Sequence, residues 1–127
     1  MTTFTSDLRR VLLRDLDTLA DLLRLYPEEE QIWAPIPGVP NTTGTLTLHL
    51  TGNLRHFIGA ILGGSGYVRD RPREFADRDV SRDEMLEGIE ATRAVVDETL
   101  RKLDPASLTE PFPQPIGGAT LTTGRQL

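Results

Sequence analysis

The chain has 127 residues, 38% of them hydrophobic and 26% charged, which is enough for one domain (1–127) with one core. It has no cysteine, which excludes disulfides, thiolate metal sites and a cysteine nucleophile. The net charge of −5 argues against a nucleic-acid partner, and the lack of a signal-peptide pattern or a membrane-length apolar run predicts a cytoplasmic protein with no membrane contact.

The first predicted helix covers residues 7–25 and follows Thr5 or Ser6 as its N-cap. Its apolar residues recur at helical spacing and predict one buried face: Leu8, Val11, Leu12, Leu16, Leu19, Leu22 and Leu23. Tyr26-Pro27 ends the helix, and three further prolines mark residues 34–40 as a loop. We expect Ile32 and Trp33 to pin this loop to the core, with Trp33 largely buried.

The second predicted helix covers residues 44–62 and stops at the glycines of Gly63-Gly64-Ser65-Gly66. A helical wheel places its apolar residues in one sector, which is expected to be buried: Leu46, Leu50, Leu54, Phe57 and Ile61. His49, Asn53 and His56 border this sector, and Arg55 lies opposite, where we expect it to be solvated. The two histidines of the chain therefore share one side of one helix.

Residues 63–78 contain many charges but also Tyr67, Val68 and Phe75, so we expect an ordered loop that folds back on the helices. Its carboxylates, Glu74 among them, belong to a solvated mixed-charge segment in this interpretation. Arg69 or Arg71 is expected to pair with a nearby carboxylate.

The third predicted helix covers residues 82–103, where Ser81 and Glu84 form a capping box. Its apolar stripe comprises Met85, Ile89, Val96, Leu100 and Leu103. A proline-rich irregular connection should follow to Leu121, and Thr123 and Gln126 indicate the start of a fourth helix at about residue 124. No strand pattern interrupts this order, so the predicted fold is all-α, an up-down bundle with long connections.

His49, Asn53 and His56 form the only group of side chains in the sequence whose chemistry suggests a functional site. The two histidines are seven residues apart, about 10.5 Å along a helix axis, too far for both to bind one metal ion. A histidine at the edge of an apolar face is more often a structural residue than a ligand, and the same holds for a buried asparagine. The sequence pattern by itself identifies no catalytic or cofactor-binding residue.

The segment TGTLTLHLTGNLRHFIGAILGGSGYVRDRPREF, residues 43–75, resembles the second helix and following loop of DinB-like (DinB/YfiT-type) four-helix bundle proteins. The likeness extends from the leading helix to the final TTG. In metal-binding members, one histidine from the second helix and an H-x-x-x-H pair on the final helix hold a divalent ion such as Zn or Ni. The resemblance therefore implies a metal-ligand role for His49. It implies none for His56, which lies where many relatives have an aromatic residue.

The same resemblance implies a metal-dependent transferase or hydrolase that acts on a small thiol or another small molecule. This chain stops at Leu127, before the H-x-x-x-H pair, so we expect metal binding to be weak or absent and the chain to be inactive alone. Without a final helix, apolar faces of its neighbours would be uncovered, which predicts a homodimer. The alternative function is a non-enzymatic helical interaction module that dimerises through that face.

Overall fold

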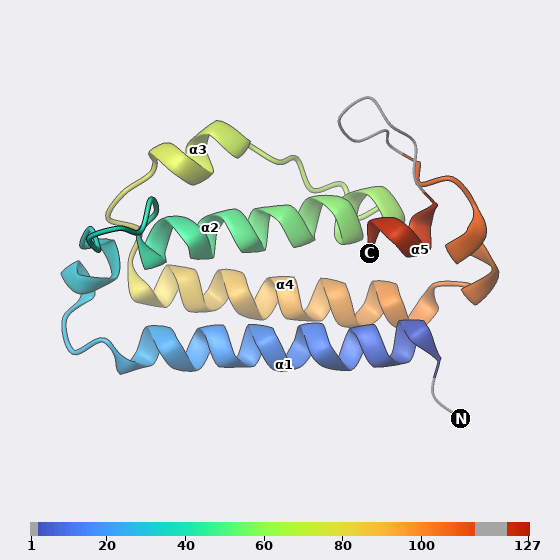
Figure 1. The fold of residues 1–127 in the computed structure, drawn as a ribbon, viewed down its shortest axis with the longest axis horizontal. Coiled ribbons are helices and arrows are strands. Elements are labelled where there is room, and N and C mark those ends of the chain that lie inside the picture. The colour runs from blue at the N-terminus through green and yellow to red at the C-terminus, as the bar shows by residue number, and fades with distance from the viewer. Residues whose placement is uncertain (1–2, 114–121) are drawn as a thin grey trace.

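A computed structural model describes residues 3–113 and 122–127. Its three long helical segments are α1 (Phe4–Leu25), α2 (Thr43–Leu54) continued by the π-helical η2 (Arg55–Leu62), and α4 (Arg82–Lys102). In Figure 1, α4 lies between α1 and α2 and contacts both. The shorter elements are η1 (Glu29–Trp33), α3 (Arg71–Ala76), η3 (Pro105–Thr109) and α5 (Thr123–Gln126). The predicted all-α bundle is confirmed, and no helix among the described residues is long and apolar enough to cross a membrane.

Helix α1 begins earlier than the sequence predicted. Thr3 is its N-cap, because the Thr3 side chain accepts a hydrogen bond from the Ser6 backbone N–H, and Thr5 is buried inside the first turn. The predicted end at Leu25 is correct. An earlier start adds a turn to the face that packs on α4.

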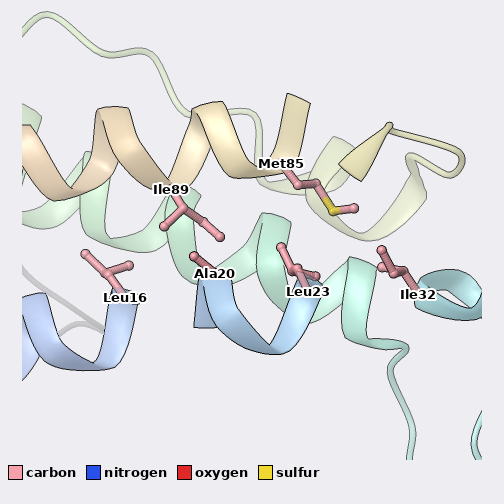
Figure 2. Close-up of a cluster of buried hydrophobic side chains, with 6 residues drawn as sticks. All are labelled: Leu16, Ala20, Leu23, Ile32, Met85 and Ile89. Atoms are coloured by element: carbon pink, nitrogen blue, oxygen red, sulfur yellow. The ribbon is translucent and has the colours of Figure 1, made fainter. Parts of the chain in front are cut away.

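One half of the core lies between α1 and the start of α4 (Figure 2). Leu16, Ala20 and Leu23 of α1 point toward Met85 and Ile89 of α4. The proline-rich loop closes this end through Ile32, which is 1% exposed. Trp33 packs against the same cluster, with its ring over Gly44 and its indole N–H donating to the Val80 carbonyl at 3.2 Å, so it pins the loop as predicted.

Helix α4 follows its sequence pattern closely. The Ser81 hydroxyl accepts the Glu84 backbone N–H at 3.1 Å, so the helix starts at Arg82 as the capping box predicted. The buried residues continue the predicted stripe and add one threonine: Met85, Ile89, Thr92, Val96 and Leu100. Because this stripe is buried along its whole length, α4 is the central helix of the bundle.

The predicted buried sector of α2 was wrong in its first half. Leu46 and Leu50 are 39% and 46% exposed, whereas Thr47 and Gly52 are buried. The helix turns its small residues toward α4 and α3 and leaves its leucines at a face that the described elements cover only in part. Close approach between helices favours small side chains, and a wheel that ranks residues by hydrophobicity alone misses this.

The second half of the same helix widens into the π-helical segment η2, which begins at Arg55 and ends at Leu62. Ile58 is buried here, 3% exposed, and packs with Val96 and Leu100 in a second core cluster. The helix stops at the glycines as predicted, and Gly64 adopts a φ of +62°, a backbone conformation that glycine tolerates best.

Residues 63–78 are ordered and fold back over α2, as predicted, but they contain a helix that the sequence did not reveal. Asp70 caps α3 by accepting the Arg73 backbone N–H at 3.2 Å, and Pro72 occupies its first turn. Figure 1 shows α3 lying on the side of α2 away from α1. Val68 is not an anchor, because it is 86% exposed.

The C-terminal part of the chain is described in two pieces. Phe112 is buried, and Pro111 and Thr122 form an isolated antiparallel bridge that brings α5 back beside η3. The predicted fourth-helix start corresponds to α5, and Leu127 packs against the second core cluster. Residues 114–121 of the predicted irregular connection lie outside the described residues.

The contact between α2 and α3 requires glycine at position 52. A Cβ atom placed on Gly52 would lie 1.9 Å from Oε2 of Glu74, whereas one placed on Gly88, in the middle of α4, would meet no atom within 4 Å.

We therefore expect Gly52→Ala to destabilise the protein by roughly 2 kcal/mol or more, through overpacking that displaces α3. Gly88→Ala is the matched control and should stabilise by about 0.5–1 kcal/mol, since alanine is the better helix former. Urea unfolding of both variants measures the difference. Equal stability changes of the same sign would contradict the close contact at position 52.

Candidate functional site

The candidate site is built around His49, which α2 directs toward α3. Its Nδ1 lies 3.2 Å from Oε1 of Glu74, and its ring lies beside that of Phe75, with centroids 4.9 Å apart. Its side chain is 28% exposed. The imidazole is thus held on one edge by α3 while part of the ring remains accessible.

Glu74 is held by a second and stronger partner. Nε of Arg69 donates to Oε2 at 2.8 Å and Nη2 donates to Oε1 at 2.9 Å, a two-point contact between guanidinium and carboxylate. The two side chains are only 11% and 7% exposed. Arg69 precedes α3 and Glu74 lies in its first turn, so the Asp70 cap that starts this helix also sets their pairing.

Two opposing effects act on the Glu74 carboxyl group. Burial raises its pKa, but the hydrogen bonds and charge of Arg69, together with the contact to His49, outweigh it and hold the pKa below the usual 4.5. Glu74 is therefore ionised at neutral pH and can only accept hydrogen bonds.

This charge state decides which nitrogen of His49 carries a proton. Nδ1 must donate to Glu74, and the longer 3.4 Å contact of the same nitrogen with Nη2 of Arg69 then joins two donors and is no hydrogen bond. In the neutral ring, Nε2 is left with its lone pair. A carboxylate that orients a histidine in this way is the usual outer partner of a metal-binding imidazole.

The other residues predicted to border the apolar sector do not join this cluster. His56 packs edge-on against Phe57, with centroids 4.7 Å apart, and Asn53 is half-buried. Arg55, expected to be solvated, is instead half-buried under Tyr67, because η2 begins at this residue and its side chain turns toward the 63–78 segment.

Sequence reasoning missed Glu74, which it assigned to a solvated segment. Arg69 was named as one of two arginines expected to find a carboxylate, and this prediction is confirmed, although the pair is buried and not exposed. The signal that could have revealed Glu74 is Gly52, three residues after His49 on the same side of the helix. A glycine beside a polar residue inside a helix indicates the close approach of another segment.

The residues present fit a metal ion only in part. His49 offers one correctly oriented nitrogen, but no group of three or more histidines or carboxylates that could hold a metal ion occurs among residues 3–113 and 122–127. One imidazole does not retain a divalent ion, which commonly takes three protein ligands in catalytic zinc sites. We therefore derive no metal-dependent reaction step from these residues.

The buried carboxylate of Glu74 should affect the stability of the fold at low pH. A lowered pKa in the folded state means that Glu74 stabilises the fold above pH 4.5, and this contribution is lost as the pH falls through the folded-state pKa. Glu74→Gln should lose this part of the pH dependence. At pH 7 it should also destabilise by roughly 3 kcal/mol, since Arg69 is left almost buried without its partner.

Chemical denaturation between pH 7 and pH 3 measures both effects. Glu98→Gln is the control, because the Glu98–Lys102 pair is exposed on both sides and its loss should change stability little. Equal losses of stability in the two variants at pH 7 would show that the buried Arg69–Glu74 pair matters no more to stability than the exposed Glu98–Lys102 pair.

Comparison with known proteins identifies a family for the sequence. The sequence model of the DinB superfamily matches residues 12–127. The comparisons with curated proteins and with solved structures give no match. The matched residues run from the middle of α1 through α2, α3 and α4 to the end of the chain. The chain belongs to the DinB superfamily.

Proposed function

We propose that this protein has the metal-dependent chemistry of a DinB-type transferase or hydrolase, with His49 as one ligand of a divalent ion such as Zn or Ni. The observation that supports the proposal is the contact between Nδ1 of His49 and Oε1 of Glu74 at 3.2 Å. This contact presents Nε2 as a ligand without any further rearrangement. The proposed substrate is a small thiol or another small molecule.

The division of labour among the residues follows from the geometry. His49 would bind the ion, Glu74 would keep the imidazole in the required tautomer, and Arg69 would hold Glu74 in place. A bound divalent ion would lower the pKa of a water or thiol and polarise the substrate. The described residues contain no group of three metal ligands, and residues 1–2 and 114–121 include no histidine, cysteine or carboxylate, so we propose that this chain alone is inactive.

Metal titration tests the role of His49. In calorimetry with Zn²⁺ or Ni²⁺, we expect the chain to bind weakly and His49→Ala to abolish that binding, because the imidazole is the only strong donor of the cluster. Glu74→Gln should weaken binding by about tenfold or more through the loss of orientation.

His56→Ala is the matched control and should bind like the wild type, since His56 lies on the same helix but outside the cluster. Nitrogen-15 NMR of the imidazoles provides an independent check, with the proton of neutral His49 expected on Nδ1. Metal binding that survives His49→Ala and disappears in His56→Ala would overturn the assignment.

One observation favours the alternative, a helical interaction module. Leu46 and Leu50 lie one turn apart on α2 and are 39% and 46% exposed. We propose that a second copy covers Leu46 and Leu50, because a two-fold arrangement allows each leucine ridge to cover the other.

Light scattering measures this association. We expect a dimer for the wild type and a monomer for the double variant Leu46→Gln, Leu50→Gln. Leu25→Gln is the control, because Leu25 is 74% exposed and lies at the end of α1. A monomeric wild type, or a double variant that remains dimeric, would count against the module.

A further inference from the structure

A pocket of about 370 Å³ lies between α2, the segment before α3, and the first turns of α4. Its volume is within the range of small-molecule sites. Glu74 lines it from one side while also contacting His49, so the pocket adjoins the candidate metal ligand, but His49 does not line it.

Arg55 lines the pocket with a guanidinium that lacks a polar partner. Its Nε is buried and makes no hydrogen bond among the described residues, and no ion pair of Arg55 occurs among them. The guanidinium group instead lies over the Tyr67 ring, with its carbon 4.4 Å from the ring centroid. Because Nε is closed to solvent, the two Nη atoms, which make no hydrogen bond among the described residues, are the donors that an incoming acceptor can reach.

The stacking on Tyr67 also determines what kind of partner Arg55 can accept. An aromatic ring occupies the face of the guanidinium, whereas hydrogen bonds are donated in its plane. The edge therefore remains available to a planar acceptor with two oxygens, and a carboxylate has this geometry. The π-helical segment η2 begins at Arg55, and such irregular turns occur frequently at functional sites.

The acidic residues of the pocket already have other contacts or lie in the open. Glu74 pairs with Arg69, Asp77 pairs with Arg73, and Asp70 caps α3. Glu84 is exposed and contributes a further negative charge. These charges disfavour a ligand with two or more negative charges, so one carboxylate on Arg55 is the anion that the pocket can accept.

Three apolar side chains also line the pocket, beside Thr47, Thr51 and Gly88. Leu48 and Met85 contribute from α2 and α4, and Val68 lines the pocket although it is 86% exposed. An apolar ligand would cover this valine, which the protein itself leaves in solvent.

We propose that this pocket binds a small aliphatic monocarboxylate, with the carboxylate paired to the edge of the Arg55 guanidinium and the apolar chain lying against Leu48, Met85 and Val68. This site is distinct from the proposed metal ligand, and carboxylate binding in it requires no metal ion.

NMR titration with 4-methylpentanoate in the presence of EDTA tests the site. We expect saturable shifts of the backbone amides of Thr51, Tyr67 and Gly88. The uncharged analogue 4-methylpentanol should bind at least about tenfold more weakly, because it cannot form the charged two-point contact. Inorganic phosphate should produce no saturable shift of these amides.

Variants assign the effect to Arg55. Arg55→Gln should weaken 4-methylpentanoate binding about tenfold or more, Arg55→Lys should retain part of it, and the control Arg24→Gln, an exposed arginine of α1, should leave it unchanged. If Arg55→Gln does not fold, the difference between carboxylate and alcohol in the wild type decides. Equal binding of carboxylate and alcohol, stronger binding of phosphate, or binding unaffected by Arg55→Gln would overturn the proposal.

Discussion

The ion pair between Arg69 and Glu74 is the interaction on which the candidate site depends. Both partners belong to the segment that forms α3, and the pair fixes a carboxylate that is 7% exposed. The contact of this carboxylate with His49 then attaches α3, a helix of six residues, to α2. So short a helix is not stable alone, and its position comes from tertiary contacts. Without the pair, neither the orientation of His49 nor the wall of the Arg55 pocket would be maintained.

A buried ion pair is seldom a net source of stability, because desolvation of both charges cancels much of their attraction. Its value here lies in geometry. Glu74 uses Oε2 for Arg69 and Oε1 for both Arg69 and His49, so one carboxylate sets the positions of two cationic or basic side chains. Gly52 makes this possible, since any Cβ at that position would occupy the space of Oε2. The sequence requirements of the site therefore include a residue without a side chain.

The bundle and the site draw on different parts of the packing. Helix α4 has its apolar stripe buried between α1 and α2, and this central position accounts for both core clusters. Helix α2 contributes small residues to that core and keeps its leucines, Leu46 and Leu50, at a partly exposed face. The face toward α3 carries His49 and Arg55, each held by a residue of the 67–75 segment. The same helix thus contributes to the core, to the candidate site and to a partly exposed apolar surface.

The sequence by itself determined the helical class, the ends of α4 and the end of α1, because capping residues, prolines and apolar spacing act locally. It also pointed to His49, through its resemblance to DinB-like proteins, and to Arg69 as one of two arginines expected to pair with a carboxylate. Only the tertiary structure decided that Glu74 is the partner, that Arg55 lies under Tyr67, and that the indole N–H of Trp33 donates to the Val80 carbonyl. These outcomes depend on how α3 and the loops meet the long helices, which involves contacts between residues up to 47 positions apart in the sequence. A helical wheel ranks side chains by polarity, and it could not foresee that close packing selects Gly52 and Thr47 over Leu46 and Leu50 for burial.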